Sequence, residues 1–178
     1  MSGLWRLGLV LALCWLPAAA RADDQAMLDR AIAGAVRQFD AARPGLGQQL
    51  FGVDVSRYGE ALHQRRFSGG AWAGETRLAL SIRTKPSGSC SRYAAFVRLP
   101  PEDGTLLLVL CPQFFTPRAD ALRVLTILHE MVHVVTGRGE CQAMAFTARI
   151  EMLATGAFTP VDKYWRASKC ATTEYRLP

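Results

Sequence analysis

The stretch that decides the fold is residues 122–153, LRVLTILHEMVHVVTGRGECQAMAFTARIEML, which contains the pentad His-Glu-Met-Val-His at 129–133. Two histidines four residues apart lie one turn apart on the same face of a helix, so both imidazoles can reach one metal ion. The glutamate after the first histidine, Glu130, points to the adjacent side, where it can take a proton from a water on the metal. The pattern predicts a metal site, and neutral imidazole favours zinc.

The residues around the pentad indicate a helix. An apolar stripe recurs at three- and four-residue steps: Leu122, Leu125, Leu128 and Val132. Thr116 and Pro117 are expected to begin this helix, as N-cap and first residue, and Gly137 to end it. Two of the three histidines of the chain fall in the motif. A chance match has odds on the order of 10⁻³, which disfavours the alternative of an ordinary buried helix.

A third protein ligand is needed, since catalytic zinc sites have three. No histidine follows His133, which leaves a carboxylate. Residues 137–139, Gly-Arg-Gly, allow a tight reversal of the chain, after which Glu140 begins a second helix. Glu140 would leave this turn close to the metal and is the expected ligand. Glu151 and Asp162 remain alternatives, because the sequence does not determine how the two helices cross.

Residues 1–22 are expected to be a secretory signal peptide, and residues 23–178 a single domain. Arg6 supplies the positive charge of such a signal, residues 7–16 an apolar run, and Ala-Arg-Ala at 20–22 the cleavage site. The apolar run is too short to span a bilayer. The sequence therefore predicts a secreted or periplasmic protein without a stable membrane anchor.

The charge of the chain is mildly basic. The whole sequence has 21 basic and 15 acidic residues, a net charge of +6. Loss of Arg6 and Arg21 with the signal leaves 19 basic against 15 acidic residues, or +4. This excess is dispersed and lacks the basic blocks with interleaved aromatic residues that bind nucleic acid. We expect a monomer that contacts a protein, a peptide or an anionic envelope surface, and no nucleic acid.

Four cysteines remain once Cys14 leaves with the signal, and an even number in an exported protein indicates two disulfides. Cys90 and Cys111 flank two strand-like runs at nearly equal distances from the turn between them, so they are expected to pair. Cys141 is then left to pair with Cys170, which ties the region after the motif to the C-terminal tail. A cysteine-bound zinc site is disfavoured because no Cys-x-x-Cys spacing occurs.

The whole pattern predicts a small α+β domain. Apolar residues at helical spacing over 23–42 indicate an N-terminal helix. Residues 47–74 are ambiguous, with a short strand, a helix or a glycine-rich loop as interpretations. A small antiparallel sheet is expected from three runs, 77–83, 92–99 and 105–110. The metal-binding helix and the second helix follow this sheet.

Residues from Leu110 to about Ala148 resemble a known family. Cys-Pro-x-Phe-Phe at 111–115, followed by Leu-x-Ile-Leu-His-Glu-x-x-His at 125–133, is similar to the deuterolysin-type secreted metalloendopeptidases of the zincin clan. The match covers roughly a quarter of the mature chain. The resemblance implies a zincin-like fold, with the two motif histidines as zinc ligands and the motif glutamate as general base.

The loop after the motif departs from that family. There the third ligand is an aspartate within Gly-Thr-x-Asp-x-x-Tyr-Gly, whereas Gly-Arg-Gly-Glu-Cys-Gln-Ala at 137–143 occupies the place here. The acid is Glu140, the loop is shorter and the tyrosine is missing. Glu-x-x-Ala is more similar to zincins with a glutamate ligand. Tyr164 and Tyr175 are the candidates for a tyrosine that stabilises the oxyanion.

These patterns predict an exported zinc-dependent peptidase. Zinc held by His129, His133 and Glu140 would activate a water, with Glu130 as the general base. Two other functions stay open. A zinc amidase or peptidase directed at peptidoglycan fits the export and the basic charge. A non-catalytic, disulfide-bonded binding module with a vestigial metal site fits the cysteines.

Overall fold

The computed structural model describes residues 16–178, with side chains from residue 22 onward. Residues 1–15 of the expected signal peptide lie outside the described residues. Helix α1 (Leu16–Ala42) includes the helix expected over 23–42 and begins earlier. Its core-facing side chains recur every three or four residues: Leu28, Ala31, Ala35, Phe39 and Ala42. This stripe packs α1 against the two helices that carry the sequence motif and the residues after it.

The segment that was ambiguous in sequence forms a short hairpin followed directly by a helix. β1 (Gln49–Leu50) pairs with β2 (Val53–Asp54), and α2 (Val55–Gln64) begins at the next residue. The side chain of Asp54 caps α2 by accepting a hydrogen bond from the backbone N–H of Arg57. This cap explains why the helix within residues 47–74 begins at Val55.

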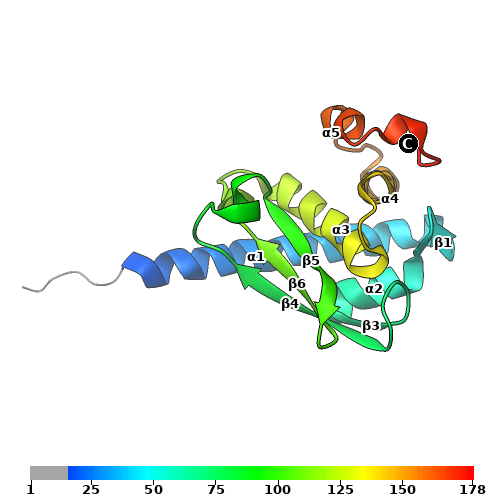
Figure 1. Ribbon diagram of the computed structural model, residues 1–178. Helices are drawn as coiled ribbons and strands as arrows, with labels where there is room; N and C mark the ends of the chain where they lie inside the picture. Colours follow the sequence, from blue (N-terminus) through cyan, green and yellow to red (C-terminus); the bar gives the residue numbers. More distant parts are fainter. Residues whose placement is uncertain (1–15) are drawn as a thin grey trace, which may run out of the picture.

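The main sheet has four strands in the order β3-β4-β6-β5 (Figure 1). Their bounds are β3 (Arg66–Ser68), β4 (Glu75–Ile82), β5 (Ala95–Glu102) and β6 (Thr105–Leu110). The β3–β4 and β5–β6 pairs are antiparallel. The β4–β6 pair is parallel, with Leu78 opposite Leu106, so the expectation of a wholly antiparallel set is wrong here. After β4 the chain crosses to the edge and forms β5, and β6 then returns between them.

Side chains on one face of the sheet pack against the helices. Leu78, Leu106 and Leu108 are buried on this face, and the exposed Arg77 points to the other face, as alternation along a strand requires. Short 3-10 helices join the larger elements: η1 (Arg43–Gly45), η2 (Gly88–Ser91), η3 (Pro112–Phe115) and η4 (Cys170–Thr172). The fold is therefore of the α+β class, as expected.

The two helices of the motif region are α3 (Asp120–Thr136) and α4 (Glu140–Thr155). The predicted start of α3 is wrong by three residues, because Thr116 closes η3 and Arg118 has a left-handed φ of +62°. Gly137 ends α3, as expected. The chain reversal between α3 and α4 places their adjoining ends side by side (Figure 1).

Both expected disulfides, Cys90–Cys111 and Cys141–Cys170, are present. The second joins the first turn of α4 to the C-terminal segment, which includes α5 (Asp162–Ala167). Two disulfides indicate folding in an oxidising environment such as that outside the cytoplasm. None of the helices in residues 16–178 has the length and apolar character needed to cross a bilayer.

Candidate metal centre

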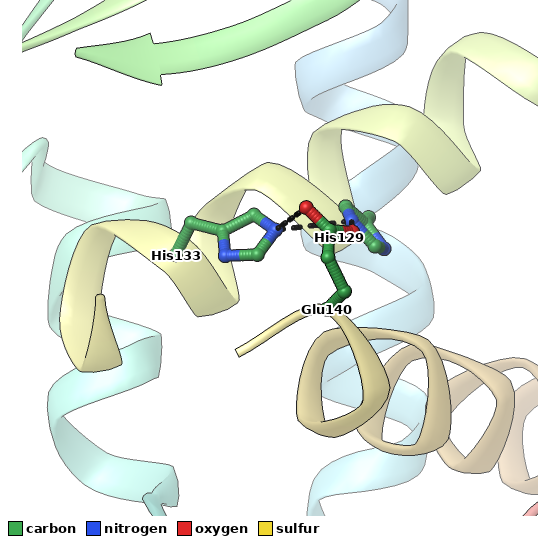
Figure 2. A group of neighbouring side chains, drawn as sticks. All are labelled: His129, His133 and Glu140. Atoms are coloured by element: carbon green, nitrogen blue, oxygen red, sulfur yellow. Dashed lines mark hydrogen bonds and ion pairs between the residues drawn. The ribbon is translucent and has the colours of Figure 1, made fainter. Parts of the chain in front are cut away.

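The two motif histidines lie on one face of α3, as their spacing predicts. The ring centroids of His129 and His133 are 4.9 Å apart, and their Nε2 atoms are 3.1 Å apart. Both rings point toward the start of α4 (Figure 2). His133 is buried, and the side chain of His129 is 22% exposed. One histidine is thus held firmly by the core while the other faces the opening of the centre.

Glu140, the first residue of α4, completes the group. Its Oε2 lies 3.4 Å from Nε2 of His129, and its Oε1 lies 3.6 Å from Nε2 of His133 (Figure 2). The reversal that brings it there depends on Gly137, whose φ of +94° and ψ of −140° are accessible to glycine alone without strain. The Glu140 side chain is 60% exposed, so the centre opens to solvent on this side.

The donor set fits a metal ion. One ligand atom from each of the three residues lies within 4.8 Å of the others. Zinc binds imidazole nitrogen and carboxylate oxygen at 2.0–2.2 Å, so a tetrahedral site separates its ligand atoms by about 3.4 Å. The observed separations of 3.1, 3.4 and 3.6 Å lie close to this value. The group could therefore hold a transition-metal ion without a rearrangement of the chain.

His133 is oriented by a backbone carbonyl. Its Nδ1 lies 2.8 Å from the carbonyl oxygen of Gly137. Because a carbonyl only accepts, the proton sits on Nδ1, and the Nε2 lone pair faces the centre in the neutral ring. Burial lowers the pKa of His133, but hydrogen bonding to Glu140, the charge of Glu130 and the Gly137 carbonyl raise it more. The net pKa of His133 is above its usual value.

The two carboxylates of the site have opposite environments. His129 and His133 would donate to Glu140 when protonated, and this interaction holds the pKa of Glu140 far below its usual value, so that this carboxylate is ionised. Glu130 is only 7% exposed, and burial raises the pKa of its carboxyl. The backbone N–H of Val97 on β5 lies close enough to the Glu130 carboxyl to lower its pKa, against the larger effect of burial. This backbone contact could not be expected from the sequence motif.

The outer edge of β5 faces the centre. The carbonyl of Ala94 accepts a hydrogen bond from the N–H of Cys111. The backbone N–H and C=O groups of even-numbered residues in this part of β5 therefore point toward β6, and those of odd-numbered residues point away from it. On that free side Val97 reaches Glu130, and the carbonyl of Leu99 lies 3.5 Å from Nη2 of Arg138. The edge strand therefore contacts both the motif glutamate and the loop that precedes Glu140.

The other residues that the sequence offered as metal ligands or oxyanion stabilisers do not join this group. Both carboxylate oxygens of Glu151 bind Thr159, one to its N–H at 2.9 Å and one to its hydroxyl at 3.0 Å. Asp162 begins the exposed helix α5. Tyr164 is 68% exposed, and Tyr175 packs edge-on against Phe51. Among the described residues, only Glu140 joins the two histidines in a group that could hold a metal.

Trp72 is a neighbour of the site that the sequence analysis did not single out. It lies in the glycine-rich loop of residues 69–74, and its Nε1–H donates a 2.6 Å hydrogen bond to the carbonyl of Val134. Its ring also lies 4.0 Å from the position that a Cβ on Gly137 would take. Through Trp72 this loop contacts the end of α3. In the sequence, a single tryptophan in a glycine-rich loop was the only feature that could have indicated this contact.

The centre combines a group that could hold a metal ion, a buried carboxylate beside it and a strand edge that contacts this carboxylate and Arg138. Comparison with models of protein families, with curated proteins and with solved structures finds no match for this chain. Its chemistry is therefore argued from the geometry of these residues.

Proposed function

We propose that this chain is an exported, zincin-type zinc peptidase that hydrolyses peptide bonds with Glu130 as the general base. One observation carries the proposal. His129, His133 and Glu140 converge as a group that could hold a metal ion, and the buried carboxylate next to His129 is in contact with the outer edge of a β-strand. A metal, a base and a strand edge are the parts that hydrolysis of an extended peptide requires.

Zinc is the ion that this donor set favours. Two imidazoles and one carboxylate are typical of catalytic zinc sites, which keep a further position open. Harder cations such as calcium and magnesium prefer sites built of oxygen. When bound, zinc supplies Lewis acidity, which polarises a carbonyl and makes water acidic near neutral pH. The exposure of the Glu140 side chain supports access of water and substrate to the group.

Glu130 supplies proton transfer. Its carboxylate takes a proton from the attacking water and delivers it to the amide nitrogen as the carbon–nitrogen bond breaks. Burial keeps this carboxyl apart from bulk solvent, and the backbone N–H of Val97 lies beside it. The proposal thus gives separate roles to the two carboxylates: Glu140 binds the metal and Glu130 moves the proton.

The substrate in this proposal is a protein or peptide in an extended conformation. β5 is the last strand of its sheet, so its outer side has no partner strand and is open to another chain at the groups that Glu130 and Arg138 do not engage. Backbone pairing aligns a peptide without reading its sequence, since the hydrogen bonds involve groups that all residues share. Selectivity must then come from side chains that border the edge.

The test uses the oxidised protein of residues 23–178 and its Glu130→Gln variant. The wild type should bind close to one zinc per chain and cleave an unfolded protein. Glu130→Gln should bind the same amount of zinc and lose at least about 100-fold in rate, the usual contribution of a general base. Glu60→Gln, an exposed residue of α2, is the matched control and should keep the activity.

Three outcomes would contradict the proposal. A Glu130→Gln variant that cleaves at the wild-type rate excludes Glu130 as the base. A zinc-loaded chain that clears isolated cell walls but leaves unfolded protein intact would point to peptidoglycan as the substrate. A chain that binds zinc and hydrolyses no amide, or binds no zinc at all, would be a binding module.

A further inference from the structure

Arg138 lies between the two halves of the metal-binding group, five residues after His133 and two before Glu140. Its side chain is exposed, and its Nη2 lies 3.5 Å from the carbonyl oxygen of Leu99 on the outer edge of β5. A cation therefore lies beside the edge strand, in the loop that joins the two halves of the group.

The charge of Arg138 has no counter-ion within the described side chains. In residues 22–178, four other arginines form ion pairs with carboxylates, Arg57 with Asp54, Arg77 with Glu75, Arg98 with Glu102 and Arg123 with Asp120, and the remaining arginines form none. Within residues 22–178, no such ion pair includes Arg138.

The two nearest acidic residues of the centre are already engaged. The Glu140 oxygens face the two histidines, and the buried Glu130 lies beside the N–H of Val97. Arg138 is thus a cation whose guanidinium makes a single long contact with a neutral carbonyl. The guanidinium has five N–H donors, so most of its capacity to bind a carboxylate is unused.

The edge strand sets the position of Arg138 relative to the reacting bond. Val97 contacts Glu130 and Leu99 contacts Arg138, and two residues along a strand span about 7 Å. A peptide paired with this edge has the same rise per residue as β5. Arg138 would therefore contact the peptide about two residues from the bond on which Glu130 acts.

The pairing edge also ends at this point. Pro100 and Pro101 follow Leu99 and have no backbone N–H to donate. A bound peptide beyond this point therefore finds a guanidinium in place of further strand pairing. That combination favours a charged group over a continuing backbone.

We propose that Arg138 determines specificity by binding a substrate carboxylate about two residues from the bond that is cleaved, an inference that rests on the proposed peptidase function. The planar guanidinium can donate two parallel N–H groups to the two oxygens of one carboxylate. An acidic side chain and the terminal carboxylate of a short peptide offer the same chemistry. Arg138 touches the substrate and takes no part in proton transfer.

The experiment compares peptides that differ in one carboxylate. One set carries Glu or Gln two residues before or after the cleaved bond, and a second ends two residues after the bond with a free carboxylate or an amide. The zinc-loaded wild type should prefer the carboxylate member of one set by about 10- to 100-fold in kcat/KM, the range of a hydrogen-bonded ion pair. The set that shows the preference identifies the source of the carboxylate.

Variants then assign the preference to Arg138. Arg138→Gln should remove it through a rise in KM for the carboxylate peptide alone, with kcat and zinc content unchanged. Arg138→Lys should restore part of it, because the charge remains while the two-pronged geometry is lost. Arg98→Gln, which removes an arginine of β5 that is paired with Glu102, should keep the full preference.

The outcomes separate the inference from the proposed function. A wild type that cleaves both members of every pair equally overturns the role of Arg138 and leaves the peptidase intact. Equal loss of rate for both members in Arg138→Gln would mean that the arginine only supports the loop, which also overturns it. Failure to cleave any peptide overturns the peptidase proposal and the inference together. The wild-type comparison needs no variant to fold.

Discussion

The Nδ1 of His133 donates a 2.8 Å hydrogen bond to the carbonyl oxygen of Gly137, the residue that ends α3 and starts the turn toward Glu140. The same residue therefore orients one metal-binding side chain through its carbonyl and another through its backbone angles. A substitution that disturbs this turn should therefore weaken metal affinity more than does an equally destabilising substitution elsewhere in the chain.

Gly137→Ala tests this relationship. A side chain at φ +94° and ψ −140° is strained, which should cost about 1–3 kcal/mol of stability. Relief of the strain rotates the carbonyl away from His133 and shifts Glu140. Loss of such an orienting partner typically weakens metal affinity 10- to 100-fold. Competition with a chelating dye measures the zinc affinity, and denaturant unfolding of the metal-free protein measures the stability.

Gly156→Ala is the matched control. Gly156 ends α4 in the left-handed region at φ +78°, and nothing lies within 4 Å of the Cβ that alanine would add. The change should cost about 1–2 kcal/mol and leave the zinc affinity unaltered. An equal loss of zinc affinity in both variants would show that general destabilisation, and not the carbonyl of Gly137, explains the effect.

Glu140 and Glu151, the two main candidates for the third ligand, make opposite predictions. Glu140→Ala should reduce zinc well below one per chain, because it removes one of three ligands. Glu151→Ala should keep the zinc and lose about 1–3 kcal/mol, because the N–H and hydroxyl of Thr159 lose their partner. Metal analysis and unfolding of both variants decide between them.

How far the sequence predicts the centre depends on whether a feature is local. The positions of His129 and His133 follow from helical spacing, and that of Glu140 follows from two glycines that permit a tight reversal. The pairing of Cys141 with Cys170 followed from elimination. Each of these required only a short stretch of chain or a count.

Features that depend on tertiary packing were missed. The parallel pairing of β4 with β6 arises because β6 returns between β4 and β5. The alternation of apolar and polar residues within a strand does not indicate which strands lie beside it. The contact of Val97 with Glu130 uses a backbone N–H, which every residue but proline carries. The start of α3 was misplaced because Arg118 adopts a left-handed φ that is uncommon for arginine.

Asp120 should make stability depend on pH at the start of α3. Its hydrogen bond and charge pairing with the buried Arg123 lower the pKa of the Asp120 carboxyl below its ordinary value of 3.8. A carboxyl with a lowered folded pKa stabilises the fold above the unfolded pKa, and this contribution is lost as the pH falls through the folded pKa. Asp120→Asn should therefore be less stable than the wild type at neutral pH.

The difference between these two proteins should shrink below about pH 4 and vanish in stronger acid, where the wild-type carboxyl is protonated as well. Denaturant unfolding at several pH values measures it. A difference that stays constant across the acid range would mean that the asparagine side chain alters the end of the helix by some other route.

The two disulfides should be separable by their effects on the metal centre. They enclose similar lengths of chain, with sequence separations of 21 residues for Cys90–Cys111 and 29 for Cys141–Cys170. Replacement of either pair by serine should therefore cost a similar amount, about 2–4 kcal/mol. Cys141 directly follows Glu140, so loss of the second disulfide should also loosen the carboxylate and weaken zinc binding. The variant without Cys90–Cys111 should keep wild-type zinc affinity. Equal zinc affinities in both variants would show that the turn alone holds Glu140 in place.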